Sequence, residues 1–388
     1  MPYYYRLGQV PPKRHTQFRR QTGELYHEEL MGQEGFSSDQ SLLYHLAAPT
    51  EILTVEWLGT TDLDYEEAGP LRHRLLRTGP CEVGGDAVSG RVPLMGNSDV
   101  RLFIARPDSS MTYFYRYADG DEVLFIHEGT GTLRTQFGSL DYRPGDYLVI
   151  PNGTTWQLDP DPSTTQRMLV IEASGHIRPP RRYLSPRGQF LEHAPYCERD
   201  LRPPTELQTH DEVGEFEIRV KARGGISRQI GRRHPFDVVG WDGCLWPYAF
   251  SIHDFEPITG RIHQPPPVHQ TFEGPGFVVC SFVPRLFDYH PDAIPAPYHH
   301  SNTDSDEVLY YVAGNFMSRR GIEEAAISVH PNGIPHGPHP GKYEGSIGKT
   351  ATEELAVMVD TFRPLRITRS AHRFEDLDYF RTWLPCPD

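Results

Sequence analysis

The sequence lacks any apolar run of about 18 residues, so we expect neither a membrane-spanning helix nor a membrane partner. Residues 1–17 also lack the apolar segment of a secretory signal. Cysteines are few, odd in number and never in Cys-x-x-Cys spacing; they are Cys81, Cys197, Cys244, Cys280 and Cys386. This pattern argues against a disulfide framework and fits a reducing compartment, so we expect a cytoplasmic protein.

Basic residues are outnumbered by acidic ones. The 38 lysines and arginines stand against 52 aspartates and glutamates, which gives a formal net charge of −14. We therefore expect no nucleic-acid partner, because nucleic-acid binders generally present an excess of basic residues. An anionic substrate would need a local basic pocket.

Glycine, proline and aromatic residues, in contrast, are plentiful. The chain has 35 glycines and 36 prolines among its 388 residues. Such a composition suits many short strands joined by turns, so we expect a mainly β fold with few helices. The length allows two domains, or two halves of one.

Histidine is frequent as well, with 19 in the chain. A cluster lies between residues 253 and 339, and its members are His253, His263, His269, His290, His299, His300, His330, His336 and His339. Such a cluster raises the expectation of a metal site, although several members must be bystanders.

Two pairs of matching segments indicate an internal duplication. "DEVLFI" at 121–126 matches "DEVLYY" at 306–311, and "IPNGTTW" at 150–156 matches "HPNGIPH" at 330–336. The segments occur in the same order and at nearly the same separation, which is the signature of a repeated domain. The alternative is that both are generic strand and turn pieces.

The second copy resembles the two motifs of the cupin fold, a small double-sheet jelly roll. It carries His-x-Asn-x(4)-Glu from His300 to Glu307, then a strand, a glycine turn, and Pro-x-Gly-x-x-His ending at His336. Side chains two apart on a strand point the same way, so these residues can face one cavity. The resemblance implies a bicupin, with two jelly-roll barrels in tandem.

The two copies differ at the ligand positions. Where the second copy has His300, Glu307 and His336, the first has Tyr115, Glu122 and Trp156. Tyrosine and tryptophan are poor substitutes for imidazole at a divalent metal. We therefore expect residues 1–175 to form a cupin-like domain that has lost its metal ligands, and residues 176–388 to form the catalytic domain. The Pro-rich segment 178–188 reads as the crossing between them.

Two histidines and one carboxylate leave adjacent positions open on an octahedral metal, as in non-haem Fe(II) oxygenases. Zinc can use the same ligands for hydrolysis, and manganese can replace iron. The ligand set alone thus favours Fe(II) and leaves a metal-dependent isomerase or hydrolase open. A non-catalytic cupin is disfavoured because the set is complete.

Several longer segments resemble homogentisate 1,2-dioxygenases. They are "YADGDEVLFIHEGTGTLRTQFGSL" (117–140), "VGWDGCLWPYAF" (239–250), "GFVVCSFVPR" (276–285), "PYHHSN" (297–302) and "HPNGIPHGPH" (330–339). Residues 23–45 resemble the opening of that family more loosely. The likeness covers most of the chain.

Carried over by position, the family's iron ligands fall on His300, Glu307 and His336. His300 is preferred to His299 because Asn302 follows it at the family's spacing. Asp306 competes with Glu307, since the family spacing after the first histidine can be one residue shorter; alignment with Glu122 in the first copy favours Glu307.

Further roles are implied by the same resemblance. His330 matches a histidine that lines the family's site, as a second layer or as a substrate contact. His263 best matches the acid–base histidine, with His269 as the alternative; imidazole can take and return a proton near neutral pH. Phe316 stands where the family has a tyrosine. An arginine should meet the substrate carboxylate, and Arg285 and Arg228 are candidates that the sequence does not rank.

The resemblance implies cleavage of an aromatic ring: homogentisate and O2 would give maleylacetoacetate, in tyrosine and phenylalanine degradation. Phe316 keeps open another hydroquinone acid, such as gentisate. The partners expected are a small aromatic acid and O2. A homo-oligomer, trimeric or hexameric, is implied by the family. His372–Trp383 has helical spacing and is expected to form a terminal helix.

Overall fold

The computed structural model describes residues 3–385, so Cys386 lies outside the described residues. Within that range every regular element is a β-strand or a short 3-10 helix, and the mainly β prediction is confirmed. No helix among the described residues has the length and apolar character needed to cross a membrane. The four cysteines in this range are free.

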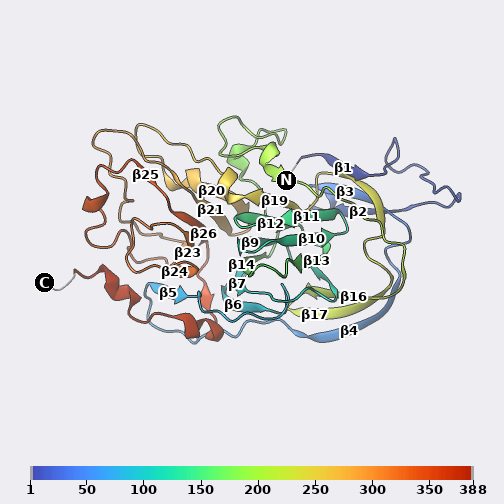
Figure 1. Ribbon diagram of the computed structural model, residues 1–388, viewed down its shortest axis with the longest axis horizontal. Helices are drawn as coiled ribbons and strands as arrows, with labels where there is room; N and C mark the ends of the chain where they lie inside the picture. The colour runs from blue at the N-terminus through green and yellow to red at the C-terminus, as the bar shows by residue number, and fades with distance from the viewer. Residues whose placement is uncertain (1–2, 386–388) are drawn as a thin grey trace.

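The first barrel is built from two sheets packed face to face (Figure 1). One sheet has the order β11 (Gly138–Tyr142), β10 (Gly131–Thr135), β13 (Thr155–Pro160), β8 (Phe114–Tyr117), β16 (Val213–Ala222), β17 (Gly225–Arg233) and β4 (Ile52–Thr60). The other has the order β15 (Leu201–Arg202), β19 (Tyr248–Ser251), β12 (Asp146–Ile150), β9 (Glu122–Glu128), β14 (Arg167–Ala173), β7 (Val100–Ala105), β6 (Arg91–Gly96) and β27 (Arg366–Ile367).

The second barrel has one large sheet and a smaller layer. The large sheet has the order β20 (Gln270–Gly274), β21 (Phe277–Phe282), β26 (Leu355–Thr361), β23 (Asp306–Ala313), β24 (Ala326–His330) and β5 (Arg74–Arg77). The smaller layer contains the pair β22 (Arg285–Leu286) and β25 (Ala351–Thr352).

A fifth sheet covers one end of the first barrel. Its order is β1 (Tyr5–Gly8), β18 (Val238–Gly243), β3 (Gln40–His45) and β2 (His27–Gly32). The 3-10 helices are η1 (Glu34–Phe36), η2 (Arg181–Tyr183), η3 (Glu198–Asp200), η4 (Ile252–Asp254), η5 (Pro266–His269), η6 (Glu344–Ser346), η7 (Arg369–Phe374) and η8 (Tyr379–Trp383).

The alternation of side chains along β9 and β23 sets the packing of the two barrels. On β9, Val123 and Phe125 join the core shared by the two barrels, whereas Leu124 and Ile126 fill the first barrel. On β23, Val308 and Tyr310 enter the shared core. Since neighbouring side chains on a strand point to opposite faces, Glu307 is turned toward the inside of the second barrel.

The duplication predicted from the sequence is visible in the strand pairing, which is consistent with the bicupin that the resemblance implies. Tyr115 pairs with Trp156 in the first barrel, and His300 bridges to His336 in the second. The turns after β9 and β23 also match, because Gly129 and Gly314 have φ of +97° and +91°, a conformation that favours glycine.

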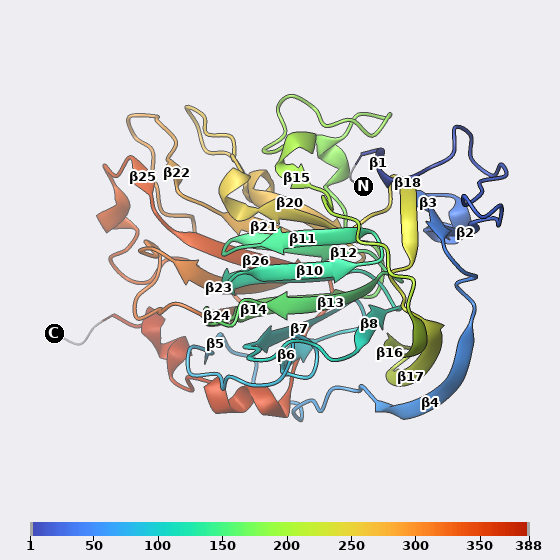
Figure 2. The same cartoon turned by 45° about the vertical axis from the view of Figure 1, so that its right-hand side comes forward.

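The predicted division of the chain at residue 175 stays a prediction, and strand pairing crosses that position. β5 pairs with β24 in the sheet of the second barrel, where Figure 1 shows its blue ribbon beside orange strands. β16 pairs with β8, and β17 with β4, in the first barrel; Figure 2 shows β4 along the outer rim.

The C-terminal segment differs from the single helix expected over His372–Trp383. It forms the two 3-10 helices η7 and η8, separated by an extended turn. Glu375 adopts an extended conformation and bridges to Leu76 of β5, and the N–H of Asp376 donates to the Leu75 carbonyl. These strand-like contacts interrupt the helical spacing seen in the sequence.

Candidate metal centre

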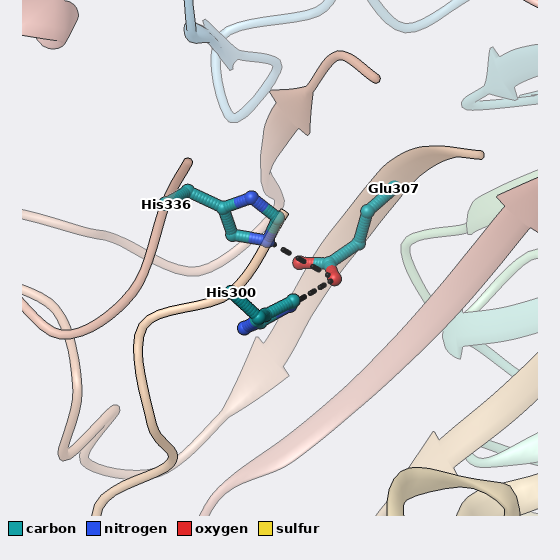
Figure 3. Close-up of side chains that lie close together, drawn as sticks. All are labelled: His300, Glu307 and His336. Atoms are coloured by element: carbon teal, nitrogen blue, oxygen red, sulfur yellow. Dashed lines mark hydrogen bonds and ion pairs between the residues drawn. The ribbon is translucent and has the colours of Figure 1, made fainter. Parts of the chain in front are cut away.

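Three side chains from separate places in the second barrel converge on one point (Figure 3). Glu307 lies near the start of β23, and His300 and His336 come from the adjoining loops. The loops are held together by two backbone hydrogen bonds of 2.8 Å, in which the N–H of each histidine donates to the carbonyl of the other. One potential ligand atom from each residue lies within 4.8 Å of the others.

The atoms that meet are both Nε2 atoms and one carboxylate oxygen. Oε2 of Glu307 lies 3.5 Å from Nε2 of His300 and 3.3 Å from Nε2 of His336. The other oxygen, Oε1, lies 2.9 Å from Nδ1 of His330. Glu307 is thus oriented through one oxygen while the second faces the two histidines.

The negative charge of the buried Glu307 carboxylate favours a cation at this position. Burial alone would raise the pKa of Glu307, yet the hydrogen bonds with His300, His330 and His336 hold it well below its usual range. Burial lowers the pKa of His330 to about 3, so that ring is neutral at pH 7. The hydrogen bond with Glu307 raises the pKa of His300, so the buried carboxylate favours a positive charge on the side of the two ligand histidines.

A divalent metal ion fits these residues. Nδ1 of His336 is buried without a hydrogen-bond partner, and its Nε2 points to Oε2 of Glu307 at 3.3 Å, so Nε2 can join that oxygen in coordination of an ion. Two imidazole nitrogens and a carboxylate oxygen form a donor set for Fe(II), Mn(II) or Zn(II). The three residues are those predicted from the sequence repeat.

Asp306 lies apart from this group. Its two oxygens accept backbone hydrogen bonds from Asn332 (2.8 Å) and Leu365 (2.7 Å). Asp121 does the same in the first barrel, where Asn152 and Ile177 donate at 2.8 and 2.7 Å. This aspartate therefore holds a loop in both repeats, and the structure brings Glu307 rather than Asp306 to the histidines.

The other predicted histidines have distinct positions. His299 is exposed, and its ring contacts the backbone at Gly337 rather than the convergent group. His330 is fully buried and stacks on His336, with ring centroids 4.4 Å apart. Its contacts fit a role in orienting Glu307.

A cavity opens directly onto the convergent residues. Its wall includes His300 and Glu307 together with the apolar side chains of Phe282, Leu309, Phe316 and Met317. Both candidates for the acid–base histidine, His263 and His269, also lie on this wall. An aromatic molecule would find an apolar enclosure beside the candidate ligands.

The two acid–base candidates have different surroundings. His263 is half exposed, and its Nδ1 lies 3.3 Å from a carboxylate oxygen of Asp288. His269 is buried against Phe282, with ring centroids 4.6 Å apart. Burial, reinforced by the nearby charge of Arg285, lowers the pKa of His269 to about 3.

Some residues beside the convergent group were not predicted from the comparison of the two sequence copies. His73, which immediately precedes β5, lies 5.6 Å from the ring of His330 and 6.0 Å from that of His336. Arg319 lines the cavity, and Trp383 of η8 donates to the carbonyl of Gly337. His73 arrives through strand exchange and Trp383 through the terminal segment, whereas Arg319 lies in the loop between β23 and β24.

The matching place in the first barrel is filled by protein side chains. Nη1 of Arg91 lies 2.7 Å from Glu122 and 2.8 Å from Glu172, and the indole N–H of Trp156 donates to Glu122 at 3.3 Å. The guanidinium also lies over the ring of Tyr115. An arginine cation thus accompanies Glu122 where the second barrel presents two histidines.

Comparisons with known proteins point to one family. Residues 83–252 match the family model described as homogentisate 1,2-dioxygenase N-terminal. A protein named "Putative dioxygenase" from Saccharolobus solfataricus is 41% identical over 387 residues, covering 99% of each chain.

More distant relatives carry a specific name. Homogentisate 1,2-dioxygenases from Bradyrhizobium diazoefficiens and Emericella nidulans are 27% and 28% identical. The alignments cover 70% and 67% of this chain but only 62% and 59% of those enzymes, less than two thirds of their length. Among solved structures, a cupin 2 conserved barrel domain protein from Leptotrichia buccalis aligns over 78% of this chain and 100% of its own, at a TM-score of 0.34 and 10% identity.

Proposed function

The chain belongs to the homogentisate 1,2-dioxygenase family, and from this premise we propose that it is an Fe(II)-dependent dioxygenase that opens the ring of homogentisate to give maleylacetoacetate. The observation that carries the proposal is the convergence of His300, Glu307 and His336, of which His300 and Glu307 line a cavity that also has apolar side chains on its wall. We place this reaction in the cytoplasmic breakdown of tyrosine and phenylalanine.

His300, Glu307 and His336 would hold the iron. An iron held by these two imidazoles and one carboxylate would supply open coordination sites for substrate and oxygen and a path for electron density between them. The protein's own part is to keep the three ligands in place. His330 fixes one oxygen of Glu307, and the paired backbone hydrogen bonds fix the loops of His300 and His336.

Proton transfer is assigned to His263. If Nδ1–H donates to Asp288, Nε2 is left as an acceptor for the proton of a ring hydroxyl. His269 is a weaker base, since its buried ring has a pKa of about 3. His263→Ala is expected to retain the metal and lose rate by about 100-fold or more. Full activity in this variant, with an inactive His269→Ala, would reverse the assignment.

The apolar wall does two further things. Phe282, Leu309 and Phe316 offer surfaces against which an aromatic ring can pack, and they exclude water from the ring. Phe316 also favours a second candidate substrate. Where the family has a tyrosine this side chain offers no hydroxyl, so a related hydroquinone acid such as gentisate is the alternative.

Oxygen uptake with a substrate panel tests the proposal. The protein is reconstituted with Fe(II) without oxygen, then mixed with aerated homogentisate, gentisate or hydroquinone. We expect uptake and ring-opened absorbance with homogentisate, and none from Fe(II)-free or Zn(II)-loaded protein. Uptake only with gentisate would select the alternative. If none of the compounds causes oxygen uptake, the dioxygenase proposal is wrong and a metal-dependent isomerase or hydrolase is the remaining alternative.

A further inference from the structure

Arg285 stands out among the charged groups of the cavity because its guanidinium, which lies over the ring of Phe287, has no hydrogen-bond or ion-pair partner among the described residues. The residue begins β22, and its side chain lines the same cavity as His300 and Glu307. Nη1 is buried and makes no hydrogen bond, and within residues 3–385 no carboxylate lies in ion-pair distance of the guanidinium. A buried donor left unpaired costs free energy that a bound acceptor would recover.

The nearby carboxylates do not neutralise this charge. Burial lowers the pKa of Arg285, against the opposing effect of Glu354 and Asp288. Burial also raises the pKa of Glu354, which weakens it as a counterion, and Asp288 already contacts His263. The charge of Arg285 reaches into the cavity, since it helps to lower the pKa of His269 on the same wall.

The other arginines near or proposed for the site are already engaged. Arg319, which also lines the cavity, donates through Nη1 to the carbonyl of Gly337 at 2.7 Å, although its Nε is buried without a hydrogen-bond partner. Arg228, the second candidate taken from the sequence, lies on β17 of the first barrel and pairs with Glu56. Among the described residues that line the cavity, Arg285 is therefore the arginine with a buried terminal nitrogen, Nη1, that makes no hydrogen bond.

Resting on the proposed function, we propose that Arg285 binds the carboxylate of the aromatic acid substrate and thereby makes the cavity select ring-bearing acids over their neutral analogues. Guanidinium matches a carboxylate in charge and in its planar, two-pronged geometry. In a chain of net charge −14 such a local cation is what an anionic substrate requires. Arg285 would then bind the carboxylate of the substrate, and the ring hydroxyls would bind at the iron site.

The test measures binding rather than turnover. Homogentisate and 2-methylhydroquinone share the dihydroxylated ring, and only the former carries a carboxylate. Their Kd values are measured by calorimetry without oxygen on the Fe(II)-loaded wild type, Arg285→Gln, Arg285→Lys and, as the matched control, Arg228→Gln. Metal content and thermal unfolding establish that each variant is folded and loaded.

We expect the wild type and Arg228→Gln to prefer the acid by roughly ten- to hundredfold, the range of a charge-assisted hydrogen bond. Arg285→Gln should lose this preference while its Kd for 2-methylhydroquinone is unchanged, and Arg285→Lys should regain part of it. An unchanged preference in Arg285→Gln, or no preference in the wild type, or no binding of either compound, overturns the inference.

Failure of the proposed function gives a different result. Wild-type protein would then show no oxygen uptake with homogentisate, yet its Arg285-dependent preference for the acid would persist. If uptake occurs and Arg285→Gln keeps the wild-type ratio of kcat/KM values for the acid and the neutral compound, the function stands and the assignment of Arg285 falls.

Discussion

Glu307 and Asp306 are neighbours on β23, and their side chains have different roles because they point to opposite faces of the strand. Glu307 faces His300 and His336, whereas Asp306 accepts two backbone N–H groups from loops. The sequence left these two residues as candidates for the carboxylate ligand of the metal. The distance in sequence from His300 is compatible with either residue as the ligand, so this spacing alone could not decide between them. The repeat favoured Glu307, because it aligns with Glu122 as Asp306 aligns with Asp121.

Substitution of the two carboxylates should have separate effects. Glu307→Gln is expected to lose most of the bound metal with little change in fold, because the amide carries no charge. Asp306→Asn is expected to keep the metal and lose about 1–3 kcal/mol of stability, since it weakens two buried hydrogen bonds. Metal content by plasma emission and urea unfolding check both, and metal loss in Asp306→Asn alone would contradict the assignment.

At the same scale, His45 links stability to pH far from the metal centre. Burial alone would lower its pKa, but hydrogen bonds with Asp237 and Glu29 raise it from 6.5 to about 9. Because the folded pKa exceeds the unfolded one, the stabilising contribution is complete below about pH 6.5 and is lost as pH rises through about 9.

The loss should be on the order of 3 kcal/mol. Urea unfolding of the wild type and His45→Gln at pH 6 and 9.5, taken as roughly below and above the two pKa values, measures it. We expect the wild type to lose more stability than the variant. His15→Gln is the control, because His15 is exposed and pairs only with Glu28. Equal pH dependence in wild type and His45→Gln would contradict the account.

Among the elements, β9 and β23 carry the same scaffold with different chemistry. The sequence predicted this pair, because the scaffold residues recur and only the ligand positions change. It could not predict what replaces the metal in the first barrel. Arg91 lies on β6, outside both repeated segments, and reaches Glu122 and Glu172 only through the folded sheet.

This buried group joins four strands of the first barrel. Arg91 on β6 contacts Glu122 on β9 and Glu172 on β14, and Lys221 on β16 lies 2.6 Å from Glu172. Arg91→Met is expected to lower the free energy of unfolding by about 3–5 kcal/mol, because it leaves a buried carboxylate unpaired.

The matched control is Arg134→Met, which removes a partly exposed ion pair with Asp159 and should cost less than about 1 kcal/mol. Chemical unfolding gives both values. Equal effects of the two substitutions would show that the buried group is not a structural replacement for the metal.

For the molecule as a whole, the sequence predicted two cupin barrels but not the exchange of strands between them. β5 pairs with β24, and β18, which follows residue 175, pairs with β1 and β3. These pairings join positions with no shared motif, so no pattern in the sequence marks them. They also bring His73 to the metal centre from the first part of the chain.

Separation of the chain at residue 175 should therefore fail to give two stable domains. Each half would lose strands that complete its sheets and would expose unpaired strand edges, which favour aggregation. Residues 1–175 and 176–388, produced separately, are expected to show no cooperative thermal unfolding, while co-expression restores a complex. Two soluble halves that unfold cooperatively by themselves would contradict this view.

We propose that His300, Glu307 and His336 hold an iron used to consume oxygen with an aromatic acid. An oxygen electrode tests it most directly, with Fe(II)-reconstituted wild type and Glu307→Gln given homogentisate under identical conditions. We expect the wild type to consume oxygen in proportion to the homogentisate added, and Glu307→Gln to consume none above background. Equal consumption by the two proteins would contradict it, as would a wild type that binds Fe(II) and consumes no oxygen with any hydroquinone acid.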